Sequence, residues 1–247
     1  MKFTFPLVLV GALLMSAGSA GRADMPVLTL NDANAPPYTT PEGEGFIDAV
    51  AGEAFRRVGV RLRLVKLPAE RGLLNANAGI EDGDVTRIAG LEAQYPNLVR
   101  VPEKLVDWEF TAFSKNASLP ATWDGIRSQT VGLVRGWKIY ENQMLGAPAV
   151  FALDDSRQLF RLLQLDRIDV ALHERWIGSG LLKQQNIGGV VALTPPLAKR
   201  EMFIYLHKKH AALAPKLATA LREIKAEGLY GKLYREKVLS LTVTAVK

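Results

Sequence analysis

Apolar and polar positions along this chain repeat with two different periods. Residues 27–31 form a short apolar run, residues 45–58 place an apolar side chain at every third or fourth position, and residues 60–67 alternate between apolar and charged. A loop and helix at 68–78 and a strand that opens at Val85 follow. A period of two predicts a strand, and a period near 3.6 predicts an amphipathic helix. The order strand, helix, strand, helix, strand is typical of a parallel sheet covered by helices.

The same order begins again in the second half of the chain, after an extended segment at 108–113. Strands are expected at 130–134 and 150–151, with a helix at 137–145 between them. The segment 155–174, DSRQLFRLLQLDRIDVALHE, predicts an amphipathic helix that feeds a mostly buried strand. Two similar α/β blocks therefore predict two lobes, although no sequence repeat is visible between them.

The last part of the chain is expected to return to the first lobe. A helix is predicted at 181–185, a β run at 202–206 crosses back, and a final helix begins near Ala214 and stops at Gly228. The fold class is therefore α/β, with two lobes joined by a two-stranded hinge. The expected boundaries are residues 24–111 and 206–247 for lobe 1, and residues 112–205 for lobe 2.

Residues 1–23 have the pattern of a secretory signal peptide. Lys2 precedes an apolar run at 3–15, and small residues follow, with candidate cleavage points after Ala20 and Ala23. This apolar core of roughly a dozen residues is shorter than the about 20 that a membrane span needs. No second long apolar run follows, so we expect a soluble periplasmic monomer.

The composition excludes several kinds of site. The 247 residues include no cysteine and only three scattered histidines, which argues against disulfides, a thiolate nucleophile, a metal or another cofactor. Lys and Arg, 31 in all, outnumber the 25 Asp and Glu, but they are dispersed. Their densest group, at 56–66, fits the solvent side of an edge strand. Without a basic stripe interleaved with aromatics, no nucleic-acid partner is expected.

Glu174 comes just after the carboxyl end of a predicted strand. Ligands of open α/β sheets bind at this edge, because the loops there converge on helix N-termini. The alternative is an ordinary acid on a surface loop, since most glutamates are exposed.

Six segments are informative in their order and spacing: LTLNDANAPPY, GFIDAVAGEAFRRVG, DGDV, VGLVRG, DRIDVALHE and LAPKLATALREIKAEGLYGKLYREK. Together they resemble the extracellular solute-binding proteins of the polar amino-acid type, the periplasmic receptors of ABC importers. The resemblance covers nearly all of the chain after residue 23. It implies a periplasmic-binding-protein-like fold, in which two Rossmann-like lobes are joined by a two-stranded hinge and a ligand cleft between them closes about that hinge. It also implies two partners, a small-molecule ligand and a membrane permease.

In that family an arginine holds the ligand carboxylate, backbone amides of a second-lobe turn assist it, and an acid holds the ammonium. The resemblance places Glu174 at the acid and Asp32 at a polar position that often faces the pocket. It places the amide-donating turn at Arg135, Gly136 and Trp137, where a helix N-terminus favours an anion.

The carboxylate-binding arginine of the family is missing. An ungapped count puts Pro96 at its position, within VTRIAGLEAQYPNLV. Arg87 is a candidate substitute, and Arg71, where many relatives have an aromatic residue over the ligand, would add positive charge. Because arginine suits bidentate recognition of carboxylates and phosphates, the hypothesis is an anionic or carboxylate-bearing ligand. The alternatives are that Arg87 pairs with Glu92 or Asp84 and that Arg71 lies on the surface.

Aromatic residues are the other candidates for ligand contact, because amphipathic rings are common at small-molecule sites. Trp137 lies in the second-lobe turn and is the strongest candidate of the four. Hinge packing would explain Trp108, and core packing would explain Trp176. The fourth is Tyr38.

Two other functions fit the same predicted fold. In a dehydratase-like enzyme, Glu174 would be a general acid with a raised pKa and cleft arginines would hold substrate carboxylates. No Ser/His/Asp grouping supports this, and His173 is expected to be a packed neighbour. The other alternative is a ligand sensor or partner-binding module, since similar lobes serve as sensor domains of membrane kinases. The sequence favours a non-enzymatic receptor.

Overall fold

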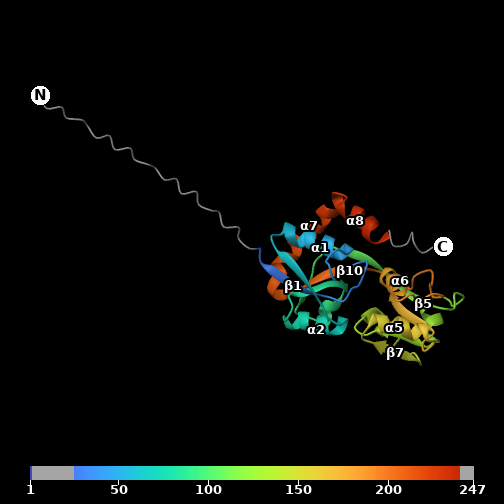
Figure 1. Ribbon diagram of the computed structural model, residues 1–247. Coiled ribbons are helices and arrows are strands. Elements are labelled where there is room, and N and C mark those ends of the chain that lie inside the picture. The colour runs from blue at the N-terminus through green and yellow to red at the C-terminus, as the bar shows by residue number, and fades with distance from the viewer. Residues whose placement is uncertain (2–24, 240–247) are drawn as a thin grey trace.

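The computed structural model describes Met1 and residues 25–239 (Figure 1). Apart from Met1, the predicted signal peptide lies outside the described residues. Within 25–239 there is no helix of the length and apolar character needed to cross a membrane. Two α/β lobes lie side by side, and β5 and β10 run between them (Figure 1).

Lobe 1 contains three parallel strands in the order β2, β1, β3, and β10 continues the sheet from β3. The short strand β4 pairs with β10. Helices α1, α7 and α8 pack against one another, while α2 packs on β1 and β3. The elements are β1 (Val27–Asp32), α1 (Phe46–Arg57), β2 (Arg61–Lys66), α2 (Ala69–Ala78), β3 (Gly83–Ile88), the 3₁₀ turn η1 (Leu91–Ala93), β4 (Leu98–Arg100), the 3₁₀ segment η2 (Lys208–Leu213), α7 (Ala214–Ala226) and α8 (Leu229–Lys237).

Lobe 2 repeats the plan with parallel strands in the order β8, β6, β7. Helices α5 and α6 pack on these strands and on each other. Asp155 begins α5 by accepting hydrogen bonds from the amides of Arg157 and Gln158. The elements are α3 (Trp123–Arg127), β6 (Val131–Val134), α4 (Lys138–Gln143), β7 (Val150–Leu153), α5 (Ser156–Gln164), β8 (Val170–Glu174), α6 (Arg175–Gln184) and β9 (Val191–Ala192).

The hinge consists of two antiparallel strands, β5 (Val106–Ser114) and β10 (Ala198–His207). Residues 106–110 pair with residues 198–202. Beyond that segment, β5 pairs with β8 of lobe 2 and β10 pairs with β3 of lobe 1. One sheet therefore continues through both lobes. The chain boundaries expected near residues 111 and 205 stay a prediction.

The predicted α/β fold with two Rossmann-like lobes is confirmed, and most predicted elements lie within a few residues of their observed bounds. The exception is the helix expected at 181–185, which begins at Arg175 as α6. It begins there because Glu174 caps it, accepting from the amides of Trp176 and Ile177. A candidate ligand residue is thus also a helix cap.

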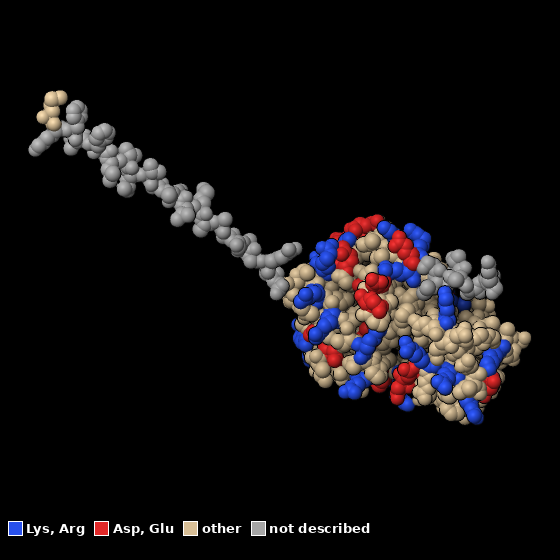
Figure 2. Space-filling model, in the orientation of Figure 1, with Lys and Arg blue, Asp and Glu red and all other residues tan. Residues whose placement is uncertain are grey.

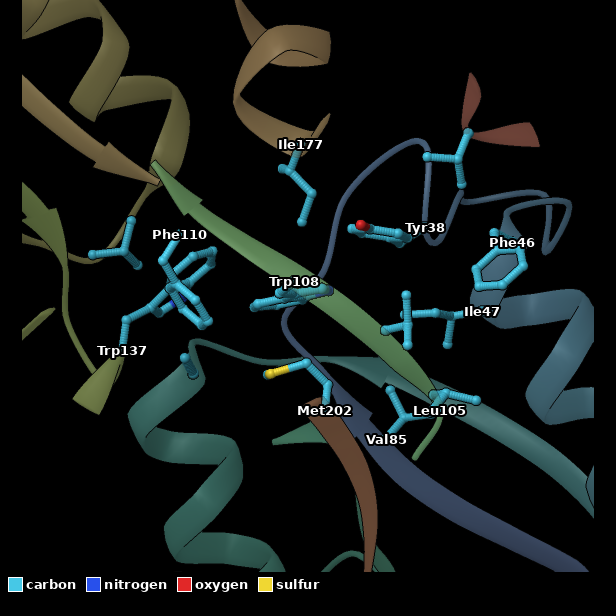
Figure 3. Close-up of a cluster of buried hydrophobic side chains, with 14 of the residues drawn as sticks. Tyr38, Phe46, Ile47, Val85, Leu105, Trp108, Phe110, Trp137, Ile177 and Met202 are labelled. Carbon is cyan, nitrogen blue, oxygen red and sulfur yellow. The ribbon is translucent and has the colours of Figure 1, made fainter. Parts of the chain in front are cut away.

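The core continues from lobe 1 through the hinge into lobe 2. Figure 3 shows Trp108 on the hinge strand between Tyr38 of lobe 1 and Trp137 of lobe 2, with Met202 of β10 beside it. All four of these side chains are buried. The surface is different, because Lys and Arg are interspersed with Asp and Glu over the face drawn in Figure 2.

Candidate functional site

The candidate site is the cleft between the lobes, where the carboxyl ends of parallel strands from both lobes meet. Two neighbouring pockets occupy it, and both are lined by Ala33, Asn34 and Trp137. The Arg87 pocket also has Thr86, Arg87, Trp108 and Lys138 in its wall. The Lys66 pocket also has Asp32, Lys66, Asp155 and Ser156 in its wall. This is the edge of an α/β sheet at which ligands bind.

Arg87 is held in a fixed orientation at the end of β3. Its Nη2 donates to the carbonyl oxygen of Ala69 and to Asp84 Oδ2, both at 2.6 Å. Asp84 Oδ2 also accepts from Asn31 Nδ2 at 2.7 Å. The residue is only 8% exposed, and its buried Nε has no hydrogen-bond partner among the described residues. A buried guanidinium with a donor that has no hydrogen-bond partner is well suited to bind an anionic ligand.

A polar network surrounds the end of β1. The amide nitrogen of Asn34 donates to Asp32 Oδ1 at 2.8 Å, and its side-chain Nδ2 donates to Asp32 and, at 3.0 Å, to Thr86 Oγ1. Lys66, at the end of β2, bonds Asp32 and donates to Thr39 Oγ1 at 2.7 Å. The carboxylate of Asp32 is therefore already neutralised and hydrogen-bonded within lobe 1.

The second-lobe turn around Gly136 lies against the start of α2. Gly136 has φ +84°, and a Cβ at this position would lie 2.5 Å from the amide nitrogen of Glu70. Lys138 Nζ pairs with Glu70 Oε2 at 2.6 Å across the two lobes and with Glu141 Oε2 at 3.1 Å. The Gly136 amide donates to Glu141 Oε1 at 2.8 Å. The lobes are thus in contact here, and the turn amide expected to bind ligand already has an acceptor.

Four aromatic rings form a continuous stack through the hinge. Ring centroids are separated by 6.0 Å between Tyr38 and Trp108 and by 5.2 Å between Trp108 and Trp137. Tyr140 continues the stack beyond Trp137 at 5.9 Å. Trp108 and Trp137 also line the Arg87 pocket, and the buried Nε1 of Trp108 has no hydrogen-bond partner among the described residues. The stack thus forms one wall of the pocket and fills the space behind it.

Glu174 is fully buried and lines neither pocket. Its Oε2 accepts from the amides of Trp176 and Ile177, both at 2.8 Å, and its Oε1 accepts from the Tyr38 hydroxyl at 3.3 Å. Burial raises the pKa of this carboxyl to about 8, because the charged form loses its hydration. The observed geometry gives Glu174 a structural role at the lobe boundary.

The structure brings together four of the eight predicted ligand residues. Asp32, Arg87, Gly136 and Trp137 all line the two pockets. Their binding roles stay predictions. The other four, which line neither pocket, are Tyr38, Arg71, Arg135 and Glu174.

Three of the residues that were expected to contact a ligand have other surroundings in the structure. Arg71 lies on the exposed side of α2. Arg135 donates to Asp154 Oδ1 at 2.9 Å and to the carbonyl oxygen of Ala152, because it directly follows β6, whose neighbour in the sheet is β7. Tyr38 is fully buried by its stacking on Trp108. Of the three predicted arginines, the cleft pockets contain Arg87 alone.

The sequence interpretation missed several residues of the cleft. Asn34 and Thr86 follow or end predicted strands, so their position at the carboxyl edge was available as a signal. Lys66 was assigned to a solvent-facing strand edge, and it is half exposed but also bonds Asp32. The pairing of Lys138 with Glu70 joins residues that are distant in sequence, and no local pattern indicates it. Within residues 25–239, no group of three or more His, Cys, Asp or Glu residues is arranged to hold a metal ion.

Comparisons with known proteins agree with the fold described above. No protein-family model matches the sequence. An uncharacterized protein of Shewanella oneidensis is 26% identical over 198 residues, covering 75% of this chain and 73% of that protein. A mutant of ArgBP from T. maritima has a TM-score of 0.72 and 20% identity, covering 85% of this chain and 94% of that chain. The chain has the periplasmic-binding-protein fold.

Two further solved structures share this fold. The substrate-binding protein of an amino acid ABC transporter has a TM-score of 0.71 and 20% identity, covering 85% of this chain and 98% of that chain. A histidine kinase sensor domain with similarity to periplasmic binding proteins has a TM-score of 0.75 and 14% identity, covering 86% of this chain and 95% of that chain. At such identities the likeness concerns the fold.

Proposed function

We propose that this chain is a periplasmic receptor that captures a small carboxylate-bearing solute between its lobes and delivers it to an ABC importer. The observation that carries the proposal is Arg87, a residue in the wall of a pocket between the lobes whose buried guanidinium has an Nε without a hydrogen-bond partner among the described residues. A carboxylate would supply the missing acceptor. Charge-assisted hydrogen bonds of this kind are about twice as strong as neutral ones.

The placement of the pocket supports a ligand-dependent closure. Arg87 and Thr86 belong to lobe 1, Trp137 and Lys138 belong to lobe 2, and Trp108 belongs to the hinge. A ligand that touches all three parts binds the closed form more tightly than an open one. Its differential affinity then shifts the population toward closure.

Transport and location rest on the comparisons and on the N-terminal pattern. One of the solved structures that share this fold is the substrate-binding protein of an amino acid ABC transporter. The signal-peptide pattern of residues 1–23 would direct the chain to the periplasm. A binding role without chemistry also agrees with the buried position of Glu174, which lines neither pocket and is engaged as a helix cap.

A ligand sensor is the second candidate, favoured by the likeness to a histidine kinase sensor domain. In both functions the protein binds a ligand in the cleft. They differ in the partner protein that recognises the closed form. Affinity purification of the tagged protein from its native envelope, with ligand present, separates them. A permease in the eluate supports transport, and a kinase supports sensing.

The receptor proposal is tested by a thermal-shift screen of residues 24–247 with amino acids, monocarboxylates, dicarboxylates and phosphorylated compounds. A ligand at 100 times its dissociation constant stabilises a protein by about 2.7 kcal/mol. At least one carboxylate is expected to stabilise the wild type, and Arg87→Gln is expected to lose the shift. The matched control is Arg71→Gln, an exposed arginine outside the pockets. The proposal is contradicted if no compound in the screen stabilises the wild type, or if Arg87→Gln shows the same thermal shift as the wild type.

A further inference from the structure

We infer that the ligand of the Arg87 pocket is a small monocarboxylate with an apolar body and no ammonium group beside the carboxylate. This rests on the proposed receptor function and adds a chemical class of ligand to it. The resemblance noted in the sequence implies amino-acid-like ligands, so the inference departs from what that resemblance predicts.

Apolar side chains from both lobes and the hinge make up most of the wall of the Arg87 pocket. They include Leu73, Ile88, Leu91, Trp108, Trp137 and Ile139. Such a wall favours a ligand whose body is hydrocarbon, because removing apolar surface from water stabilises the bound state. A strongly polar side chain would lose hydration here without gaining partners.

The charged residues in the wall of this pocket are both cations. Arg87 and Lys138 line it, and among the described residues its wall contains no Asp or Glu. Arg87 Nε and Trp108 Nε1 are buried donors without a hydrogen-bond partner among the described residues. Both cations already have carboxylate partners, Asp84 for Arg87 and Glu70 with Glu141 for Lys138, so the wall's preference for a carboxylate rests on the unpaired donors and on the absence of an acid from the described residues of the wall.

The carboxylates close to these two cations are already engaged. Asp84 accepts from Arg87 and from Asn31. Glu70 pairs with Lys138, while Glu141 pairs with Lys138 and accepts from the Gly136 amide. An incoming ammonium group would have to displace one of these interactions.

Glu174, the acid that the sequence resemblance assigns to ammonium binding, is also engaged. Both of its oxygens accept hydrogen bonds, from the Tyr38 hydroxyl and from two α6 amides. It is fully buried and lines neither pocket. Burial raises its pKa to about 8, so near neutral pH it is largely uncharged. A buried ammonium beside a neutral acid would remain unpaired, which is costly.

The inference is tested with ligand pairs that differ only by the ammonium group. The pairs are 3-phenylpropanoate with L-phenylalanine, and 4-methylpentanoate with L-leucine. Each is titrated calorimetrically into residues 24–247, and Trp fluorescence provides a second readout because Trp108 and Trp137 line the pocket. At least one monocarboxylate is expected to bind about tenfold or more tightly than its amino acid, since unpaired charged groups cost at least 1.4 kcal/mol.

A second variant adds a carboxylate to the pocket without touching Arg87. Ile139→Glu places an acid in the wall and is expected to weaken monocarboxylate binding about tenfold or more, while the uncharged Ile139→Gln weakens it less. Equal effects of the two variants would contradict a ligand that carries its charge in this pocket.

The outcomes separate this inference from the receptor proposal. If at least one of the four compounds binds but neither monocarboxylate binds more tightly than its amino acid, the inference is overturned and the receptor proposal stands. If none of the four compounds binds while the thermal-shift screen yields an amino acid, a dicarboxylate or a phosphorylated ligand that depends on Arg87, the inference is again overturned alone. If no compound binds in the titrations and none stabilises the protein in the screen, the inference and the receptor proposal are both overturned.

Discussion

The hydroxyl of Tyr38 donates to Glu174 Oε1 at 3.3 Å, joining the loop after β1 in lobe 1 to the carboxyl end of β8 in lobe 2. Tyr38 and Glu174 are both fully buried. The interaction therefore places a titratable group at the contact between the lobes, and the burial of that group gives the stability of the protein a pH dependence.

Glu174 is predicted to reduce stability as the pH rises. Burial raises its pKa from the ordinary 4.5 to about 8. Between these values the folded protein holds a proton that the unfolded chain releases, so the free energy of unfolding falls with rising pH. The contribution is complete below about pH 4.5 and is lost by about pH 8, with a slope of up to about 1.4 kcal/mol per pH unit.

Urea unfolding of Glu174→Gln at pH 5, 6.5 and 8 checks this prediction. The variant is expected to lose most of the alkaline decline, because glutamine is uncharged throughout. Glu42→Gln, which removes an exposed carboxylate, is the matched control and should keep the wild-type profile. An unchanged decline in Glu174→Gln would show that Glu174 does not titrate in this range.

His173 is predicted to act in the opposite direction. It is fully buried beside Trp137 and Phe160, and burial lowers its pKa from 6.5 to about 4. The unfolded chain binds a proton between these values and the folded protein does not, so stability falls as the pH drops from about 6.5 to 4.

The His173 prediction is checked by unfolding His173→Gln across the same acid range. Glutamine does not titrate and can still reach Ser156, whose hydroxyl oxygen lies 2.9 Å from His173 Nε2. A smaller acid loss than in the wild type is expected. If the variant loses as much stability at acid pH as the wild type, groups other than His173 determine that loss.

Gly136→Ala is predicted to oppose closure of the lobes. The added Cβ would lie 2.5 Å from the Glu70 amide nitrogen in lobe 1, a distance at which the lobes must move apart. Gly146→Ala is a matched control, because Gly146 also has a positive φ, +73°, but its nearest neighbour would be Arg127 Nη2 at 3.9 Å. Both variants should lose about 1–2 kcal/mol of stability through backbone strain. Gly136→Ala alone should weaken ligand binding, and equal affinities would contradict a closed state of this shape.

Glu70→Gln is predicted to weaken ligand binding roughly two- to fivefold, because it removes the ion pair with Lys138 between the lobes. Glu70 does not line the Arg87 pocket, so the effect acts through closure. Asp166→Asn is the control, since it removes the pair with Lys115 within lobe 2. The loss should shrink in high salt. An equal loss of ligand affinity in Asp166→Asn would show that the pair of Lys138 with Glu70 has no special role in binding.

The sequence predicted the fold well because the fold depends on local periodicity. The alternation at residues 60–67 became β2, and the helical spacing at 45–58 became α1. The cleft residues Asp32, Arg87 and Trp137 could also be predicted, because each lies near the carboxyl end of a strand or in the turn that follows one.

The remaining parts of the site depend on contacts that no local pattern records. Glu141 accepts from the Gly136 amide, and Glu174 accepts from Tyr38, which is 136 residues away in the chain. Sequence position predicts where a side chain enters a cleft, but its partners decide whether it is still available to a ligand. Arg135 shows the same limit, because the neighbouring strand β7 supplies its partners.

The role of Arg87 as the anchor of the ligand carboxylate is tested most directly by a calorimetric titration. The tightest carboxylate from the screen is titrated into the wild type, Arg87→Gln and Arg71→Gln under the same conditions. Arg87→Gln is expected to lose tenfold or more in affinity, about 1.4 kcal/mol, while Arg71→Gln stays close to the wild type. A folded Arg87→Gln variant that binds as tightly as the wild type would contradict a carboxylate site at Arg87.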